Sequence, residues 1–166
     1  MPAETLGSRP RSVEVVLSNW PLSNWPLSNW QCGVMPHPIM FDDDDPFLAR
    51  VREIALAFPE ATEKISHGRP TFSAPKMFAV YGGSRRNPDG PMLRYAHALL
   101  IKVDDSERPA LQQDPRFFHP AYLGPFGWLG LDFDAAEVDW AEVAELVDAS
   151  FRLQAPARLV RRLDGR

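Results

Sequence analysis

The stretch HGRPTFSAPKMFAVY, residues 67–81, contains two short runs of strand-forming residues separated by Ala74-Pro75. Small residues and proline between β-branched and aromatic runs are typical of a turn between paired strands. The stretch therefore predicts a hairpin with strands at 71–73 and 76–81, preceded by a loop that contains residues 67–70 and begins where the first helix ends.

Two further strands are predicted downstream of this hairpin. A polar loop rich in Gly, Pro and Arg is expected at 82–91, followed by a third strand at 93–103. Residues 128–133 alternate, with Leu129, Leu131 and Phe133 on one face, which predicts a half-buried strand.

Helical spacing of apolar residues predicts four helices, at 46–57, 104–113, 139–153 and from Pro156 onward. The acidic run that precedes the first helix is expected to cap it, with Asp45 as the N-cap. The resulting order, α-β-β-β-α-β-α-α, predicts an α+β domain: a small antiparallel sheet with helices packed on one face.

The composition bounds the class of protein. The chain has 166 residues, 45% of them hydrophobic, which fits one globular domain. Strictly apolar runs such as 98–101 do not exceed five residues, far short of the ~20 residues of a membrane span, so no membrane partner is expected. The N-terminus lacks the apolar core of a secretory signal and Cys32 is the single cysteine, which together predict a cytoplasmic protein of bacterial type without disulfides.

Residues 1–45 differ from the rest and are expected to form a disordered extension to a domain at 46–166. They contain three copies of Leu-Ser-Asn-Trp at 17–31 with a period of five, which matches neither a helix nor a strand. Two interpretations stay open: an aromatic peptide that docks on a partner, or an upstream tandem repeat translated from a start assigned too early. The identity of the copies favours the second, with Met35 or Met40 as the later start.

The domain resembles the MmcQ/YjbR family over nearly all of residues 47–163. The motifs that carry the resemblance are Phe58-Pro59-Glu60, His67-Gly68-Arg69-Pro70-Thr71-Phe72, Lys76-Met77-Phe78-Ala79, Leu100-Ile101-Lys102-Val103, Asp114-Pro115-Arg116-Phe117-Phe118, Pro120-Ala121-Tyr122-Leu123-Gly124, Gly127-Trp128-Leu129 and the segment from Trp140 to Pro156. This resemblance implies a fold like that of the bacterial frataxin homologue (CyaY-like), described as a double wing, and a DNA-binding role without an established reaction. The long loop at 82–91 and the extension depart from the family pattern.

A basic set of residues follows the predicted hairpin and its neighbours. The net charge of −4 means that any nucleic-acid role must come from a local basic surface. The candidate phosphate-binding residues are Arg69, Lys76, Arg85, Arg86 and Arg94. The alternative is that Arg85-Arg86 is a solvated loop tip and that the C-terminal arginines balance a helix dipole.

A second set of residues predicts a cleft for an anionic small molecule or a flipped base, or a surface for protein interaction. Its members are His67, Lys76, Arg116, His119, Tyr122 and Trp128. Aromatic walls with cations at the rim suit such ligands. The structural interpretation instead places Trp128 in the core and pairs Lys76 with a carboxylate.

No enzymatic motif stands out. The chain has no Gly-x-Ser-x-Gly elbow and no phosphate-binding Gly-x-x-x-x-Gly-Lys loop, and its histidines lack the i, i+4 spacing of a zinc site. An iron-binding acidic ridge would need more carboxylates on the first helix than Glu53. We therefore expect a monomeric, non-enzymatic protein without metal or cofactor, whose partner is DNA or an anionic small molecule.

Overall fold

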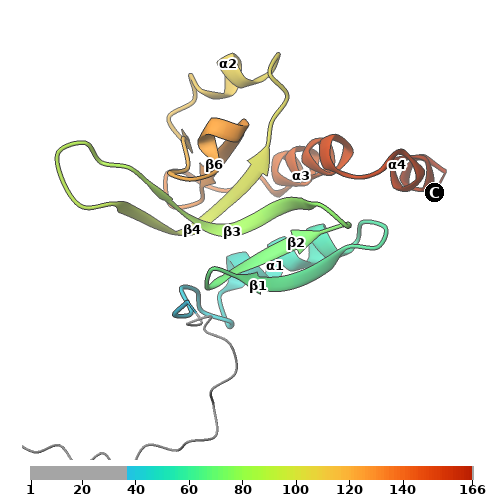
Figure 1. The fold of residues 1–166 in the computed structure, drawn as a ribbon, viewed down its shortest axis with the longest axis horizontal. Helices are drawn as coiled ribbons and strands as arrows, with labels where there is room; N and C mark the ends of the chain where they lie inside the picture. The colour runs from blue at the N-terminus through green and yellow to red at the C-terminus, as the bar shows by residue number, and fades with distance from the viewer. Residues whose placement is uncertain (1–36, 166) are drawn as a thin grey trace, which may run out of the picture. The chain divides into compact units, whose positions relative to one another are not determined.

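The computed structural model describes residues 37–165. Within them lies an α+β fold whose six-stranded antiparallel sheet has the order β1-β2-β3-β4-β6-β5 (Figure 1). The elements are α1 (Pro46–Leu56), β1 (Thr62–Ser66), β2 (Arg69–Ser73), β3 (Met77–Arg85), β4 (Leu93–Lys102), α2 (Arg108–Leu111), β5 (Phe117–Phe118), the 3-10 helix η2 (Gly124–Phe126), β6 (Trp128–Asp132), α3 (Trp140–Gln154) and α4 (Ala157–Asp164).

One side of the sheet, here called the helical face, is covered by α1 and α3, and Leu159 of α4 joins the same core. Asp45 accepts a hydrogen bond from the Phe47 amide and caps α1, as predicted, and Asp139 caps α3 in the same way. The helices bury one apolar stripe each against the sheet. The large core that results contains Leu48, Val51, Ala55, Tyr81, Leu99, Ile101, Leu129, Leu131, Val143, Val147, Phe151 and Leu159.

The opposite side, here called the loop face, has a smaller core of its own. It contains Val80, Ala98, Leu100, Phe118 and Trp128, with Leu123 packed against it. The prediction of a half-buried β6 is therefore wrong: both faces of this strand are buried, because the segment 117–123 returns over the loop face.

Strand β1 was expected to be loop. Its residues pair antiparallel with β2, from Thr62 opposite Ser73 to Ser66 opposite Arg69. The two-residue turn between them has positive φ at both positions, 51° at His67 and 74° at Gly68, which is the geometry of a type I′ hairpin turn.

The loop predicted at 82–91 begins later than expected. Strand β3 continues to Arg85 because Gly82, with φ of 75°, sits at an irregularity in the β3–β4 pairing rather than at the end of the strand. The outer ends of β3 and β4 and their connecting loop extend away from the rest of the domain (Figure 1). Helix α2 is shorter than the predicted 104–113 and forms only over residues 108–111.

The segment 37–45, predicted as part of the extension, packs on the domain. The Met40 amide donates to the Gly68 carbonyl at 2.9 Å, and the His37 and His67 rings lie 4.9 Å apart. The Leu-Ser-Asn-Trp repeat, Cys32 and the disorder predicted for them lie outside the described residues. Among residues 37–165, no helix combines the length and apolar character needed to cross a membrane.

Candidate functional site

Positive charge is concentrated in the central strands. Residues 64–103 carry seven lysines and arginines but a single acidic residue, Asp89, although the whole chain has a net charge of −4. These cations are Lys64, Arg69, Lys76, Arg85, Arg86, Arg94 and Lys102.

The cations of this stretch also differ from the others in their partners. Outside it, every described lysine or arginine except Arg161 lies within 4.0 Å of a carboxylate. Within 64–103 none of the seven makes such an ion pair. Except for Lys102, whose charge acts on nearby Asp104, no carboxylate of the described chain is shown to offset their charge.

Four of these cations lie around the outer end of the β3–β4 hairpin. Ser84 is the register partner of Arg94, and Arg85 that of Leu93. The Arg69 guanidinium reaches across from β2, donates to the Gly83 carbonyl at 3.2 Å and occupies the space that a side chain at Gly82 would need. The fourth cation, Arg86, directly follows β3 and is exposed.

Arg69 is held in an unusual environment. It is half-buried, and this burial lowers its pKa; the charge of Arg94 lowers the pKa further. A guanidinium stays protonated under such conditions. The positive charges of Arg69 and Arg94 repel each other, and no carboxylate is paired with either. Binding of an anion between them would therefore be electrostatically favourable.

A turn from the loop face completes this surface. The Phe118 ring packs against Gly83 and Gly130, where a Cβ would collide with it, and it stacks on Tyr95 at 3.9 Å. The chain continues past Phe118, and the Ala121 amide donates to the Ser84 carbonyl at 2.8 Å. This bond ties the residue before Tyr122 to the residue before Arg85.

Tyr122 keeps 66% of its surface exposed at this position. We call the group around this end of the hairpin the hairpin surface; its members are Arg69, Arg85, Arg86, Arg94 and Tyr122. Arg85 and Arg94 belong to successive register pairs, so their side chains leave opposite faces of the two-stranded ribbon. It combines four of the five predicted phosphate-binding residues with one residue predicted for the ligand cleft.

The fifth predicted cation, Lys76, lies elsewhere. It is exposed in the β2–β3 turn, immediately before β3 begins, whereas Arg85 ends that nine-residue strand. Nine residues of strand span roughly 30 Å. Lys76 therefore cannot bind the same phosphate group as the hairpin surface.

The remaining members of the predicted cleft are not brought together. Trp128 is 4% exposed in the smaller core, which matches the structural interpretation of this residue. His67 lies in the β1–β2 turn, with its Nδ1 3.0 Å from Ser66 Oγ. His119 is exposed and its Nε2 lies 2.9 Å from Gln112 Nε2. Neither Lys76 nor Trp128 lines the shallow pocket described next.

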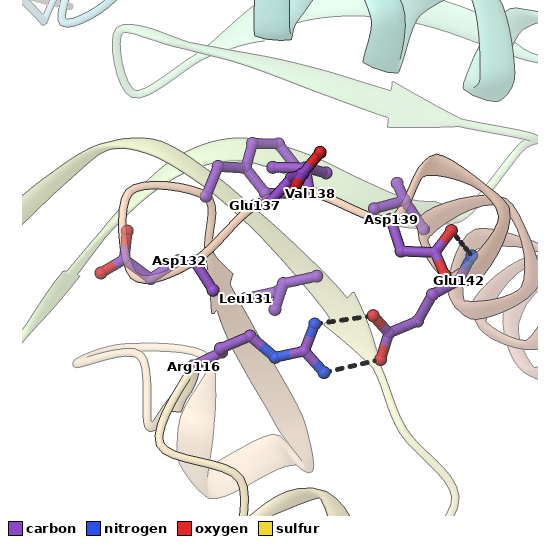
Figure 2. Close-up of a pocket in the computed structure, with 10 residues that line it drawn as sticks. Arg116, Leu131, Asp132, Glu137, Val138, Asp139 and Glu142 are labelled. Atoms are coloured by element: carbon purple, nitrogen blue, oxygen red, sulfur yellow. Dashed lines mark hydrogen bonds and ion pairs between the residues drawn. The ribbon is translucent and has the colours of Figure 1, made fainter.

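Arg116 lines a shallow pocket of about 190 Å³ between β6 and the start of α3 (Figure 2). Its guanidinium makes two hydrogen bonds to Glu142, at 2.8 and 2.9 Å, and three more to Asp114. These bonds raise the pKa of Arg116, and the same contact lowers that of Asp114. Its donors are thus used within the fold.

No group of three or more His, Cys, Asp or Glu side chains in the described part of the chain is arranged to hold a metal ion.

A polar cluster around Asp45 was not predicted from the sequence. The buried Asp45 accepts a short hydrogen bond from the Tyr81 hydroxyl, and its Oδ2 lies 3.7 Å from Nε2 of His97. The Asp-Pro start of α1 identifies Asp45 as a cap, but neither partner is near it in sequence.

Comparison with known proteins gives a family and similar solved structures. Residues 56–153 match the model of the family described as YjbR. The crystal structure of Deinococcus radiodurans protein DR2400, which contains the domain DUF419, matches with a TM-score of 0.48 and 20% sequence identity over 64% of this chain and 76% of that chain. No curated protein sequence matches this chain significantly.

Proposed function

The chain belongs to the YjbR family, and from the charges of its hairpin surface we propose that it is a nucleic-acid-binding protein rather than an enzyme. The outer β3–β4 hairpin would contact the phosphate backbone through Arg85, Arg86 and Arg94, with Arg69 at its base. A two-stranded ribbon of this kind is narrow enough to enter the major groove or to lie along a backbone.

The observation that carries the proposal is the absence of carboxylate partners around these arginines in the described chain. The other described arginines, apart from Arg161, are paired with acids. An ion-paired arginine has to give up its partner before it can bind phosphate, whereas an unpaired one only exchanges water and counterions. The hairpin surface is thus ready to bind a polyanion although the chain as a whole is acidic.

The test is a fluorescence-anisotropy titration of the full chain with labelled DNA over a range of salt concentrations. Phosphate contacts release counterions, so the logarithm of the affinity should fall linearly with the logarithm of the salt concentration. The variant R85A/R86A should weaken binding about tenfold and reduce the magnitude of that slope by roughly 1.4–1.8, which corresponds to two lost phosphate contacts.

The matched control is R158A/R162A. It removes the same two charges, but from arginines of α4 that lie near Glu60. It should leave both the affinity and the slope close to those of the unchanged protein. Equal losses in the two variants would show a bulk charge effect and contradict the proposal.

A second control separates nucleic acid from acidic protein partners. Polyglutamate carries a similar density of negative charge but no bases or phosphates. If it displaced DNA as effectively as unlabelled DNA does, the surface would be a site for acidic protein segments. Absence of DNA binding at low salt would also overturn the proposal.

A further inference from the structure

Tyr122 offers a flat aromatic face in a position where a base could reach it. Its ring is 66% exposed, although its neighbours in sequence are fixed: Pro120 is buried, the Ala121 amide is hydrogen-bonded to Ser84, and Leu123 packs on the smaller core. The backbone is therefore anchored on both sides of an outward-facing ring. Little conformational entropy remains to be lost when a ligand packs on it.

The backbone at Tyr122 lies close to the end of β3. The Ala121 amide bonds to the Ser84 carbonyl, so Tyr122 and Arg85, the next residues of the two segments, both adjoin this hydrogen bond. A nucleotide carries its phosphate and its base on one sugar, so a strand that binds Arg85 through phosphate can bring a base to Tyr122. A single exposed aromatic residue needs no explanation by itself; its place beside unpaired arginines is the informative observation.

The geometry points to a single strand, and we propose that the hairpin surface binds single-stranded nucleic acid with a base stacked on Tyr122. This inference rests on the proposed function and adds the class of nucleic acid. In a duplex the base faces are stacked on one another and only their edges are accessible. An exposed aromatic face can stack only on a base that has left the duplex or was never in one, as in known single-strand-binding proteins.

The experiment compares Tyr122→Ala and Tyr122→Phe in the full chain. The probes are a labelled single-stranded DNA of about 12 nucleotides and the duplex of the same sequence, at one fixed salt concentration. Stacking on an aromatic ring accounts for a loss of about 5- to 140-fold per base on substitution by alanine. Tyr122→Ala should show this loss for the single strand and less than a twofold change for the duplex. Tyr122→Phe, which keeps the ring face, should retain single-strand affinity within about twofold.

Phe126 provides a control of matched exposure. It is 70% exposed, but its carbonyl accepts a hydrogen bond from Lys102, at the opposite end of β4 from Arg94. Phe126→Ala should leave the affinity for the single strand within about twofold. A loss as large as that of Tyr122→Ala would contradict a specific role of Tyr122.

The outcomes distinguish the two proposals. If R85A/R86A weakens both probes but Tyr122→Ala weakens neither, or if the duplex binds more tightly than the single strand, the stacking inference fails and the nucleic-acid function stands. If the unchanged protein binds neither probe, both proposals fail. Loss of single-strand affinity in Tyr122→Phe as well as Tyr122→Ala would assign the effect to the hydroxyl group and overturn stacking.

Discussion

The two faces of the sheet are closed in different ways. The helical face is covered by α1 and α3, α4 adds Leu159 to the same large core, and the arginines of α1 and α3 are paired with acids. The loop face is covered by the segment 117–126, which contributes Phe118 to a core of five buried residues in the described chain, with Leu123 packed against it. Its edge carries the unpaired arginines of the hairpin surface.

This difference separates stability from binding. The helical face has a large apolar core and ion-paired arginines, so it can supply most of the free energy of folding. The loop face can then keep uncompensated charge and an exposed ring on a rigid support, which is the usual arrangement of binding sites on loops. Substitutions on the two faces should therefore have different effects on stability and on nucleic-acid binding.

The largest expected effect comes from the buried phenylalanines. Phe151 of α3 is fully buried, stacked on Phe58 at 4.7 Å, and Phe118 is 5% exposed on the loop face. Substitution of either by alanine should lower the free energy of unfolding by about 3–5 kcal/mol, because a cavity replaces the ring. Urea denaturation followed by circular dichroism measures this loss.

The effect of each face on DNA affinity is compared with the milder variants Phe118→Leu and Phe151→Leu, because these leave more of the protein folded than the alanine variants do. Phe118→Leu should also weaken DNA binding, because Phe118 positions the turn that carries Ala121 and Tyr122. Phe151→Leu should not change the affinity of the folded protein. Equal affinity losses in the two would show that the faces are not independent.

Much of the fold follows from local sequence patterns, and the exceptions have physical causes. The caps at Asp45 and Asp139 and the stripe of α3 are local signals, so α1 and α3 begin where predicted. Strand β1 was missed because TEKIS is polar and pairs on one side only, as an edge strand; the His67-Gly68 turn was the available signal.

The candidate site was only partly predictable. Arg85 and Arg86 were identified from sequence as loop-tip cations, and Arg69 and Arg94 as their neighbours. The addition of Tyr122 depends on a hydrogen bond between Ala121 and Ser84 and on a ring packed against two glycines. These are tertiary contacts between segments far apart in sequence, and local sequence periodicity does not predict them.

A smaller effect is expected at a polar contact that ties α3 to the sheet. The fully buried Ser150 donates from Oγ to the Phe78 carbonyl and accepts from the Lys102 amide at 2.9 Å. Ser150→Ala leaves both backbone groups without this partner and should lower the free energy of unfolding by about 1–3 kcal/mol. Urea denaturation measures the loss, with exposed Ser106→Ala as the control. An unchanged midpoint would mean that β3 and β4 do not depend on this contact. DNA affinity should stay the same, since the contact belongs to the helical face.

The smallest effect expected is a pH dependence of stability from His97. Its Nδ1 lies 3.0 Å from Asp134, and its Nε2 faces Asp45 on the helical face. The hydrogen bond with Asp134 raises the pKa of His97; the charges of Asp45 and Asp132 act in the same direction, and burial opposes them. A raised pKa in the folded state means that the protonated form is stabilised by folding.

This contribution is fully present below the ordinary histidine pKa of about 6.5 and is lost as the pH rises through the raised value. Because the side chain is 39% exposed, solvent screens the pair and the effect should stay below about 1 kcal/mol. His97→Gln should remove this part of the pH dependence when unfolding free energies are compared at about pH 5.5 and pH 8.5. His119→Gln is the control, since His119 contacts Gln112 rather than a carboxylate. If His97→Gln kept the full pH dependence of the free energy of unfolding, the pair with Asp134 would not be its source. If the variant changed DNA affinity, the effect of this pair would not be confined to the helical face.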